Sequence, residues 1–378
     1  MTTMASVEMI SLVRDGAGLI ARRSHSRFHP ADEHLYRVLR VGVCGTDLQI
    51  LRGARQDPAS VLGHEALLLK TSSEFSTPAR AVVVNPVHPD DQDSIIGHSV
   101  EGLWRNYLLA DPAVFDRLTI DACASLPVDL GPLVEPLGTA LYAWEQLRAH
   151  VPRSGRVAII GAGTAATLVA MLGEEGGYHT QLVHPRPDRL DYIDQLNVLS
   201  TTTRTSSPSS DHFDGVVTCV PREAAHAALT QALVAVTDGG IIDLFGGLPA
   251  HRHHPDLPTL DLAAIRRRNA CGRTATSAAS IKVADKTVHV TGHRGTAPHH
   301  LRLAQRLLCD QPARYQRLIT AVLSLTHAQT RIPLMACGIR SSGEHMKLII
   351  DPSLDNTATA WRPVDTGLLI GDLPGGRG

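Results

Sequence analysis

The chain has 378 residues, a formal net charge of −1 and 43% hydrophobic residues. This length and composition predict a folded protein of two domains and exclude a disordered segment. Its 36 basic and 37 acidic residues are balanced, and no basic block occurs, so we expect neither a nucleic-acid nor an anionic-membrane partner. The six cysteines are far apart and lack a Cys-x-x-Cys pair. This spacing excludes a disulfide scaffold and a four-cysteine zinc knuckle, and favours a reduced, cytoplasmic protein.

Charged residues also argue against export and membrane insertion. Glu8, Arg14 and Asp15 interrupt the short apolar pieces at the N-terminus, so we expect no signal peptide. The longest charge-free stretch, residues 157–173, is shorter than the roughly 20 residues of a spanning helix and contains a glycine turn. The lysines are few (Lys70, Lys282, Lys286 and Lys347). We interpret this arginine-rich bias as a trace of a GC-rich genome.

Up to about residue 130, short β-branched runs alternate with clusters of Pro, Gly and Asp. The runs at 37–43, 81–84 and 107–110 predict strands of a β-rich domain. Apolar residues at helical spacing then predict a helix over 133–147 that leads into a new unit.

From residue 156 onward, strand and helix patterns alternate. A strand at 156–160, a Gly-Ala-Gly turn, a helix from 164 and a strand at 180–183 form a βαβ unit. Strands at 215–219 and 240–245 follow, with a helix at 224–236 between them. The middle of the chain is therefore predicted to be an α/β domain with a doubly wound parallel sheet. The Ser/Thr-rich residues 200–210 predict a surface loop.

Three separated segments offer donors for a metal ion. Cys44 lies in a Gly-Val-Cys-Gly-Thr-Asp motif, His64 and Glu65 in a Gly-His-Glu motif, and Glu135 in a Val-Glu-Pro-Leu motif. A thiolate, an imidazole and carboxylates are suitable ligands for a catalytic zinc with an open coordination position. Each of these residue types is more often packed or on the surface, and their spacing alone does not decide between the two interpretations.

The motifs strongly resemble those of the medium-chain dehydrogenase/reductase superfamily, which includes the zinc-dependent alcohol, sorbitol and glucose dehydrogenases. The resemblance covers nearly the whole chain and is strongest to the polyol and sugar branch. Further matching segments are residues 102–107, 243–249, 290–293, 318–320 and 347–350.

The resemblance implies a GroES-like β-rich catalytic domain plus a Rossmann domain with a doubly wound parallel sheet. We place the catalytic domain at residues 1–137 and 309–352, the NADP-binding Rossmann domain at 138–308, and a frayed tail at 353–378. It also implies a homodimer or homotetramer, formed through the strand near residues 288–291.

The resemblance also assigns roles to individual residues. Cys44 and His64 would be zinc ligands, and Glu65 and Glu135 would supply a carboxylate directly or through water. Thr46 would hydrogen-bond the substrate hydroxyl and relay its proton, because a hydroxyl both donates and accepts.

Neighbouring positions are less settled. Asp47 either orients His64 through its second ring nitrogen or is an ordinary turn aspartate. The histidine that usually continues the proton relay has no obvious counterpart after Thr46.

The Gly-Ala-Gly turn predicts a dinucleotide site. Gly161 and Gly163 follow an apolar strand, and Thr164 and Ala165 begin a helix whose N-terminus would face a pyrophosphate. A glycine turn alone is weak evidence, but the strand and helix around it favour cofactor binding.

The next strand predicts which cofactor is bound. NAD enzymes place an acidic residue at its end, and this chain has His184 there, followed by Arg186 and Arg189. We therefore favour NADP over NAD, with Arg186 free to meet the 2′-phosphate. The alternative is that Asp188 replaces the acid and the arginines form a solvated loop.

The superfamily's structural zinc lobe would fall between residues 86 and 102, where this chain has no cysteine. One catalytic zinc and no structural zinc are therefore expected. His299 and His300 are assigned surface or capping roles rather than a second metal site.

We predict a zinc-dependent oxidoreductase that transfers a hydride between NAD(P) and a secondary alcohol or ketone of a polyol, sugar or cyclitol. The divergent, arginine-rich sequence suggests a secondary-metabolite pathway. Two alternatives are a zinc-independent reductase of the same superfamily and a non-catalytic cofactor-binding protein.

Overall fold

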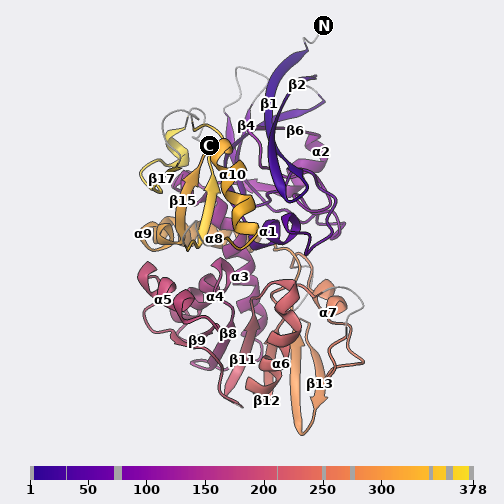
Figure 1. The fold of residues 1–378 in the computed structure, drawn as a ribbon, viewed down its shortest axis with the longest axis vertical. Coiled ribbons are helices and arrows are strands. Elements are labelled where there is room, and N and C mark those ends of the chain that lie inside the picture. Colours follow the sequence, from indigo (N-terminus) through magenta and orange to yellow (C-terminus); the bar gives the residue numbers. More distant parts are fainter. Residues whose placement is uncertain are drawn as a thin grey trace. The chain divides into compact units, whose positions relative to one another are not determined.

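The computed structural model describes residues 4–30, 32–71, 79–210, 212–248, 253–272, 277–339, 344–354 and 361–373. The chain divides into two compact units. The split unit comprises Met1–Glu135 and Leu301–Gly378, and the inserted unit comprises Pro136–His300. Figure 1 labels their elements. None of the helices in the described part of the chain combines the length and apolar character that crossing a membrane requires.

The split unit is built mainly from strands. Its first part contains β1 (Ala5–Asp15), β2 (Gly18–Phe28), β3 (His34–Val43), α1 (Gly45–Leu51), β4 (Ala66–Thr71), β5 (Arg80–Val84), β6 (Tyr107–Ala110), α2 (Pro112–Phe115), η1 (Asp116–Leu118), β7 (Thr119–Asp121) and η2 (Val128–Leu133). Its second part contains α9 (Pro312–Tyr315), η4 (Gln316–Leu318), β15 (Ile319–Leu323), α10 (Leu325–Ala336), β16 (Lys347–Ile350), β17 (Trp361–Arg362) and η6 (Ile370–Asp372).

Two long helices connect the units in sequence. They are α3 (Val134–Leu147) and α8 (Pro298–Asp310), and each contains one of the borders between the two units.

The main sheet of the split unit joins the beginning and the end of the chain. Its strands lie in the order β17-β15-β16-β3-β4-β5-β7, and β6 also pairs with β3. Strand β3 is antiparallel to β16, with Val43 opposite Leu348. The residues just after β3 are therefore held beside a strand that follows the inserted unit in sequence.

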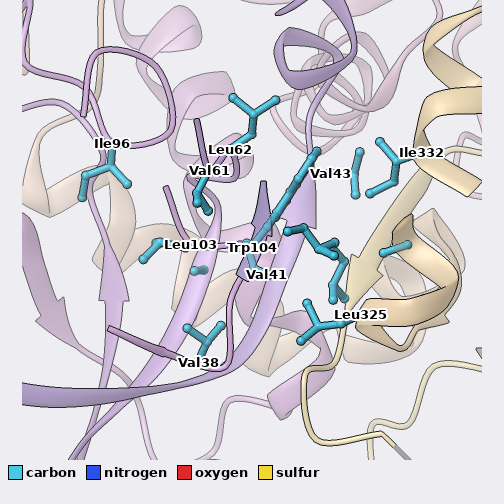
Figure 2. Packing of buried hydrophobic residues seen from close by; sticks show 14 of the residues in the cluster. Val38, Val41, Val43, Val61, Leu62, Ile96, Leu103, Trp104, Leu325 and Ile332 are labelled. Carbon is cyan, nitrogen blue, oxygen red and sulfur yellow. The ribbon is translucent and has the colours of Figure 1, made fainter. Parts of the chain in front are cut away.

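One side of this sheet is covered by an apolar core (Figure 2). It includes Val41, Val43 and Leu62 together with Leu325 and Ile332 from the C-terminal segment. Burying large aliphatic side chains stabilises the fold by roughly 1.5–3 kcal/mol each, so this core fixes the position of the end of β3.

The inserted unit is an α/β domain, as predicted. It contains β8 (Arg156–Ile160), α4 (Thr164–Glu175), β9 (His179–Val183), α5 (Pro187–Leu196), β10 (Thr203–Thr205), β11 (Phe213–Thr218), η3 (Arg222–Ala224), α6 (Ala225–Ala235), β12 (Val236–Asp243), α7 (Leu262–Arg268), β13 (Ala279–Val283) and β14 (Lys286–Thr291). The sheet order is β10-β9-β8-β11-β12-β14-β13. All neighbours pair in parallel except β13 with β14. Strands β9 and β10 lie on one side of β8, and β11 and β12 lie on its other side, so the strand order switches between β8 and β11. Folds of this kind bind dinucleotides at that switch point.

One sequence prediction for this unit is wrong. The loop predicted at residues 200–210 contains β10, which pairs in parallel with β9. The strand near residues 288–291, predicted to form the dimer contact, is β14, and it is covered on both sides by β12 and β13. Within the described residues, β13 is the strand at that edge of the sheet.

The tail predicted at residues 353–378 is also wrong where the structure describes it. Strand β17 pairs with β15, Ile370 is 1% exposed, and Arg362 donates to both carboxylate oxygens of Asp129, at 2.5 and 2.8 Å. Asp129 also accepts a hydrogen bond of 2.6 Å from Arg40. The polar, Gly/Pro-rich composition of this segment does not reveal the ion pair between Arg362 and Asp129 that holds it to the split unit.

We predict that Arg362→Met destabilises the protein. Asp129 is 1% exposed, and losing two charge-assisted hydrogen bonds leaves a buried carboxylate partly unpaired, which costs about 1–3 kcal/mol. Urea denaturation measures the loss. Arg302→Met, on the exposed face of α8, is the matched control, and equal midpoints for the two variants would contradict the anchor.

Candidate metal centre and dinucleotide site

Cys44 lies at the junction between β3 and α1. Its backbone N–H donates to Asp47 Oδ2 at 2.8 Å, so Asp47, in the first turn of α1, caps the helix that Cys44 precedes. Asp47 Oδ1 also accepts from the N–H of Gly63 at 3.3 Å. One buried carboxylate thus joins the two segments that carry Cys44 and His64.

Gly63 allows His64 to reach this place. Its φ of +91° is a left-handed conformation that L residues rarely adopt, and a Cβ there would collide with the ring of Trp104. Trp104 is fully buried and donates through Nε1 to the carbonyl of Gly42 at 3.2 Å. The first residue of the Gly-His-Glu motif is therefore glycine for a steric reason.

The structure brings three of the four predicted metal residues together. The candidate ligand atoms of Cys44, His64 and Glu65 all lie within 4.8 Å of one another. His64 and Glu65 are 6% and 2% exposed, and Glu135 is 8% exposed. Glu135, at the start of α3, is close enough to interact electrostatically with His64 and Glu65. The donor set fits a divalent cation such as zinc.

Lys347 at the start of β16 brings a buried positive charge to this group. Its Nζ forms an ion pair with Glu65 Oε2 and donates to the carbonyl of Val43 at 3.3 Å. Both side chains of the pair are 2% exposed. Burial disfavours the Lys347 ammonium, but the negative charges of Glu65 and Cys44 raise its pKa above the usual value. The sequence analysis missed this contact.

Charges within the group change the pKa values of two of its members. Burial raises the pKa of Glu135 to about 7, with His64 opposing the rise and Glu65 adding to it. Burial also disfavours protonated His64, but Asp47 and Cys44 outweigh it and raise its pKa well above the usual value. Without a metal ion, protons therefore compensate the buried negative charge.

Asp47 and Thr46 can be placed beside these ligands. Asp47 Oδ1 lies 3.6 Å from His64 Nδ1, so the two are electrostatic neighbours at a distance longer than a hydrogen bond. Thr46 is half-buried in the first turn of α1, two residues after Cys44.

His98 is a further neighbour that the sequence did not reveal. Its ring meets that of His64 edge-on, with the ring centroids 4.8 Å apart. Its Nδ1 lies 3.4 Å from the Arg55 guanidinium. His98 belongs to the cysteine-free segment 86–102, and its ring packs against the candidate ligand His64.

The glycine turn of the inserted unit has the form that a pyrophosphate requires. Gly161 has a φ of +137°, and a Cβ there would collide with the carbonyl of Cys219. Gly163, immediately before α4, has open space where a Cβ would be. The backbone N–H groups of Thr164 and Ala165 begin α4, whose positive end favours an anion.

The basic residues after β9 are arranged differently from the prediction. Arg186 is not free, because its guanidinium pairs with both oxygens of Asp188, at 3.3 and 3.0 Å. Arg189 donates from Nε to the carbonyl of Ala162 at 2.8 Å and so holds the glycine turn. His184 Nδ1 accepts from the N–H of Arg186 at 3.2 Å, and burial lowers the His184 pKa.

A second cluster of possible metal ligands, Glu145, His299 and His300, is held together by hydrogen bonds. Glu145 Oε2 lies 3.2 Å from His299 Nε2 and 2.7 Å from His300 Nε2. His300 Nδ1 accepts the N–H of Ala297 at 3.1 Å, so its Nε2 carries the proton and donates to Glu145. A protonated nitrogen has no lone pair for a metal. His300 therefore has the capping role that the sequence analysis expected.

Asp243, the last residue of β12, is an unexpected buried acid. It is fully buried, and within the described part of the chain neither of its carboxylate oxygens has a hydrogen-bond partner. Burial raises its pKa to about 7, and Arg266 opposes the rise. The sequence does contain a signal for this buried acid, because Asp243 stands within an otherwise apolar strand pattern.

Comparisons with known proteins agree with this architecture. No model of a known protein family matches the chain. The chain is 24% identical over 181 residues to the 2-dehydro-3-deoxy-L-galactonate 5-dehydrogenase of Pseudoalteromonas atlantica. The match covers 42% of this chain and 51% of that protein, so the chain spans about half the length of this curated relative.

Solved structures match over most of the chain. A zinc-binding dehydrogenase from Sinorhizobium meliloti, bound to NADP, has a TM-score of 0.68 at 18% identity over 92% of this chain and 100% of that one. L-Idonate 5-dehydrogenase of Escherichia coli has a TM-score of 0.67 at 15% identity, over 92% and 99%. Galactitol-1-phosphate dehydrogenase of E. coli has a TM-score of 0.64 at 17% identity, over 92% and 100%.

These similarities establish the fold. The chain has the two-domain fold of zinc-dependent alcohol, polyol and sugar dehydrogenases, with a β-rich domain and a Rossmann-like parallel sheet. Both the fold class and the resemblance to those dehydrogenases are thereby confirmed.

We predict that Asp243→Asn stabilises the protein at high pH. The folded-state pKa of about 7 exceeds the unfolded value of about 4, so wild-type stability falls as pH rises from about 4 through 7. The variant should gain about 1–4 kcal/mol at pH 8.5 and less at pH 5.5.

Chemical denaturation at the two pH values tests this prediction. Asp285→Asn, at an exposed turn position, is the matched control. A gain for Asp243→Asn that does not grow with pH would refute a neutral buried acid.

Proposed function

We propose that this protein is a zinc-dependent oxidoreductase that transfers a hydride between NADP and a secondary alcohol or ketone of a polyol or sugar. The observation that carries the proposal is the buried group of Cys44, His64 and Glu65, whose ligand atoms lie within 4.8 Å of one another. The similar proteins named as sugar and polyol dehydrogenases support the substrate class.

The chemistry of the donors supports a single catalytic zinc per chain. Cys44 and His64 would be direct ligands, and Glu135 would complete the set directly or through water. One oxygen of Glu65 is paired with Lys347. We therefore expect the Glu65 carboxylate to interact with both the Lys347 ammonium and the metal ion. A bound zinc would polarise the substrate oxygen and lower the pKa of its hydroxyl.

Thr46 would move the proton. Its hydroxyl, in the first turn of α1 close behind Cys44, would accept the proton of the substrate hydroxyl and donate its own onward. Asp47 would keep Cys44 and Gly63 at fixed separation through its two backbone hydrogen bonds. The nicotinamide of the bound cofactor would exchange the hydride.

The turn between β8 and α4 supports a dinucleotide cofactor, and Arg186 after β9 supports NADP. Gly161 and Gly163 leave room for the pyrophosphate at the N-terminus of α4. The pair of Arg186 and Asp188 is 37% and 53% exposed, and an exposed pair contributes only about 0.2–1 kcal/mol. A 2′-phosphate can therefore replace Asp188 as the partner of Arg186 at small cost.

Assembly into a homodimer or homotetramer is part of the proposal. The contact would use the outer edge of β13, which among the described residues pairs only with β14, in place of the strand at residues 288–291.

We predict that purified wild-type protein contains about one zinc per chain and that Cys44→Ser loses it, because the soft thiolate is replaced by a weaker donor. Elemental analysis measures the metal. The assay follows NADPH and NADH against a panel of ketones, sugars and polyols. Thr46→Val should retain zinc but lose turnover about 100-fold or more.

Cys337→Ser, at an exposed cysteine of the same unit, is the matched control and should keep both zinc and activity. Turnover by zinc-free wild-type protein would instead identify a zinc-independent reductase. Bound zinc without turnover on any substrate would favour a non-catalytic cofactor-binding protein.

We predict that Arg186→Ala weakens NADP binding about 10-fold or more, because a bidentate contact to phosphate is lost. NAD binding should be unchanged. Calorimetric titration with each cofactor measures the difference, and Arg153→Ala, at an exposed position of the same unit, is the control. Equal affinities for NAD and NADP in both wild type and Arg186→Ala would defeat the cofactor assignment.

A further inference from the structure

Two cysteines that the proposed reaction does not use lie against each other in the split unit. Cys123 follows β7 and is exposed, and Cys309 lies in the last turn of α8 and is half-buried. The two thiols contact each other, and the Ser125 hydroxyl contacts both. The Ser125 Oγ lies 3.1 Å from the Cys123 sulfur.

Backbone contacts hold these two segments together. The buried amide of Gln305 accepts the N–H of Cys123 at 2.6 Å and donates to the carbonyl of Asp121 at 3.1 Å. Cys309 lies four residues after Gln305, which is one turn further along the same helix face. Gln305 therefore fixes the Cys123 segment opposite the turn that carries Cys309.

We propose that Cys123 and Cys309 are a redox modification site that forms a reversible disulfide on exposure to a hydroperoxide. Cys123 is the thiol that reacts first, since it is exposed and its sulfur lies beside the Ser125 hydroxyl. Cys309 is the resolving thiol. The other described cysteines include Cys337, which is also exposed and serves as the internal comparison.

The chemical steps balance as follows. The Cys123 thiolate attacks the distal oxygen of the hydroperoxide, the O–O bond breaks, and a sulfenic acid forms. The departing alkoxide or hydroxide takes up the proton that the thiol had released and leaves as an alcohol or water. The Cys309 sulfur then attacks the resulting sulfenic acid, and water leaves as the S–S bond forms. The two thiols lose two electrons in total, and the hydroperoxide accepts them.

The electrostatics favour this assignment of roles. The Ser125 hydroxyl lowers the pKa of Cys123, which increases the reactive thiolate fraction near neutral pH. Burial raises the pKa of Cys309, so Cys123 is the more reactive of the two thiols. The neighbouring charged group on α8 is Asp310, which also raises the pKa of Cys309.

The bond would have a structural consequence. Cys123 precedes the inserted unit Pro136–His300 in sequence and Cys309 follows it. A disulfide between them would close a covalent loop that contains the whole inserted unit. Such a loop restricts the unfolded chain, so we expect the oxidised protein to have a higher denaturation midpoint than the reduced one.

The test treats full-length protein with hydrogen peroxide and follows it by intact mass and non-reducing peptide mapping. We expect the loss of two hydrogen atoms, a peptide that links Cys123 to Cys309, and full reversal by dithiothreitol. Cys309→Ser should instead accumulate a dimedone-reactive sulfenic acid at Cys123. Cys337→Ser, the matched control, should oxidise as the wild type does.

Wild-type protein provides a second measurement that needs no variant. Cys123 should be alkylated several-fold faster than Cys337 at neutral pH, because the Ser125 hydroxyl beside its sulfur lowers the Cys123 pKa. Oxidation without the linked peptide, or alkylation of Cys123 no faster than of Cys337, would overturn the proposal. Because neither readout involves zinc, cofactor or turnover, the result is independent of the proposed enzymatic function.

Discussion

Burial of negative charge around Cys44 is the constraint on which the candidate metal centre depends. Asp47, Glu65 and Glu135 are each less than one-tenth exposed. An ionised carboxylate without water needs a cation or hydrogen-bond donors, or else it takes up a proton. Asp47 uses backbone N–H groups, Glu65 uses Lys347, and burial leaves Glu135 with a pKa of about 7. A divalent cation at this place would satisfy Glu135 and release the protons that otherwise compensate the charge.

The backbone around the site is shaped by steric requirements. The missing side chain of Gly63 leaves room for the ring of Trp104, and a Cβ at Gly42 would collide with Glu65 Oε2. Core packing therefore constrains the candidate site, because the buried indole of Trp104 leaves room only for a glycine before His64. The inserted unit carries an analogous steric constraint at Gly161, whose missing side chain lets the turn approach Cys219.

Local patterns in the sequence were enough to predict most strands and helices and the Rossmann-like unit, and the family resemblance singled out Cys44, His64 and Glu65, whose candidate ligand atoms lie close together in the structure. What they could not predict depends on partners distant in sequence or on charge pairing. Lys347 and Glu65 are 282 residues apart, and a lysine beside three aliphatic residues does not reveal its partner. Arg362 is anchored by Asp129 across a similar gap, and the short β10 relies on β9 rather than on its own Ser/Thr-rich composition.

The pairing of β3 with β16 also sets an order of events during synthesis. All the segments of the inserted unit precede β16 in the chain, so that unit can fold while Lys347 is still inside the ribosome. Glu65 and Glu135 emerge early but receive their cationic partner late. The nascent chain therefore holds a folded α/β unit while the sheet of the split unit is still unfinished, and the buried group around Cys44 is completed only by the strand that follows the insertion.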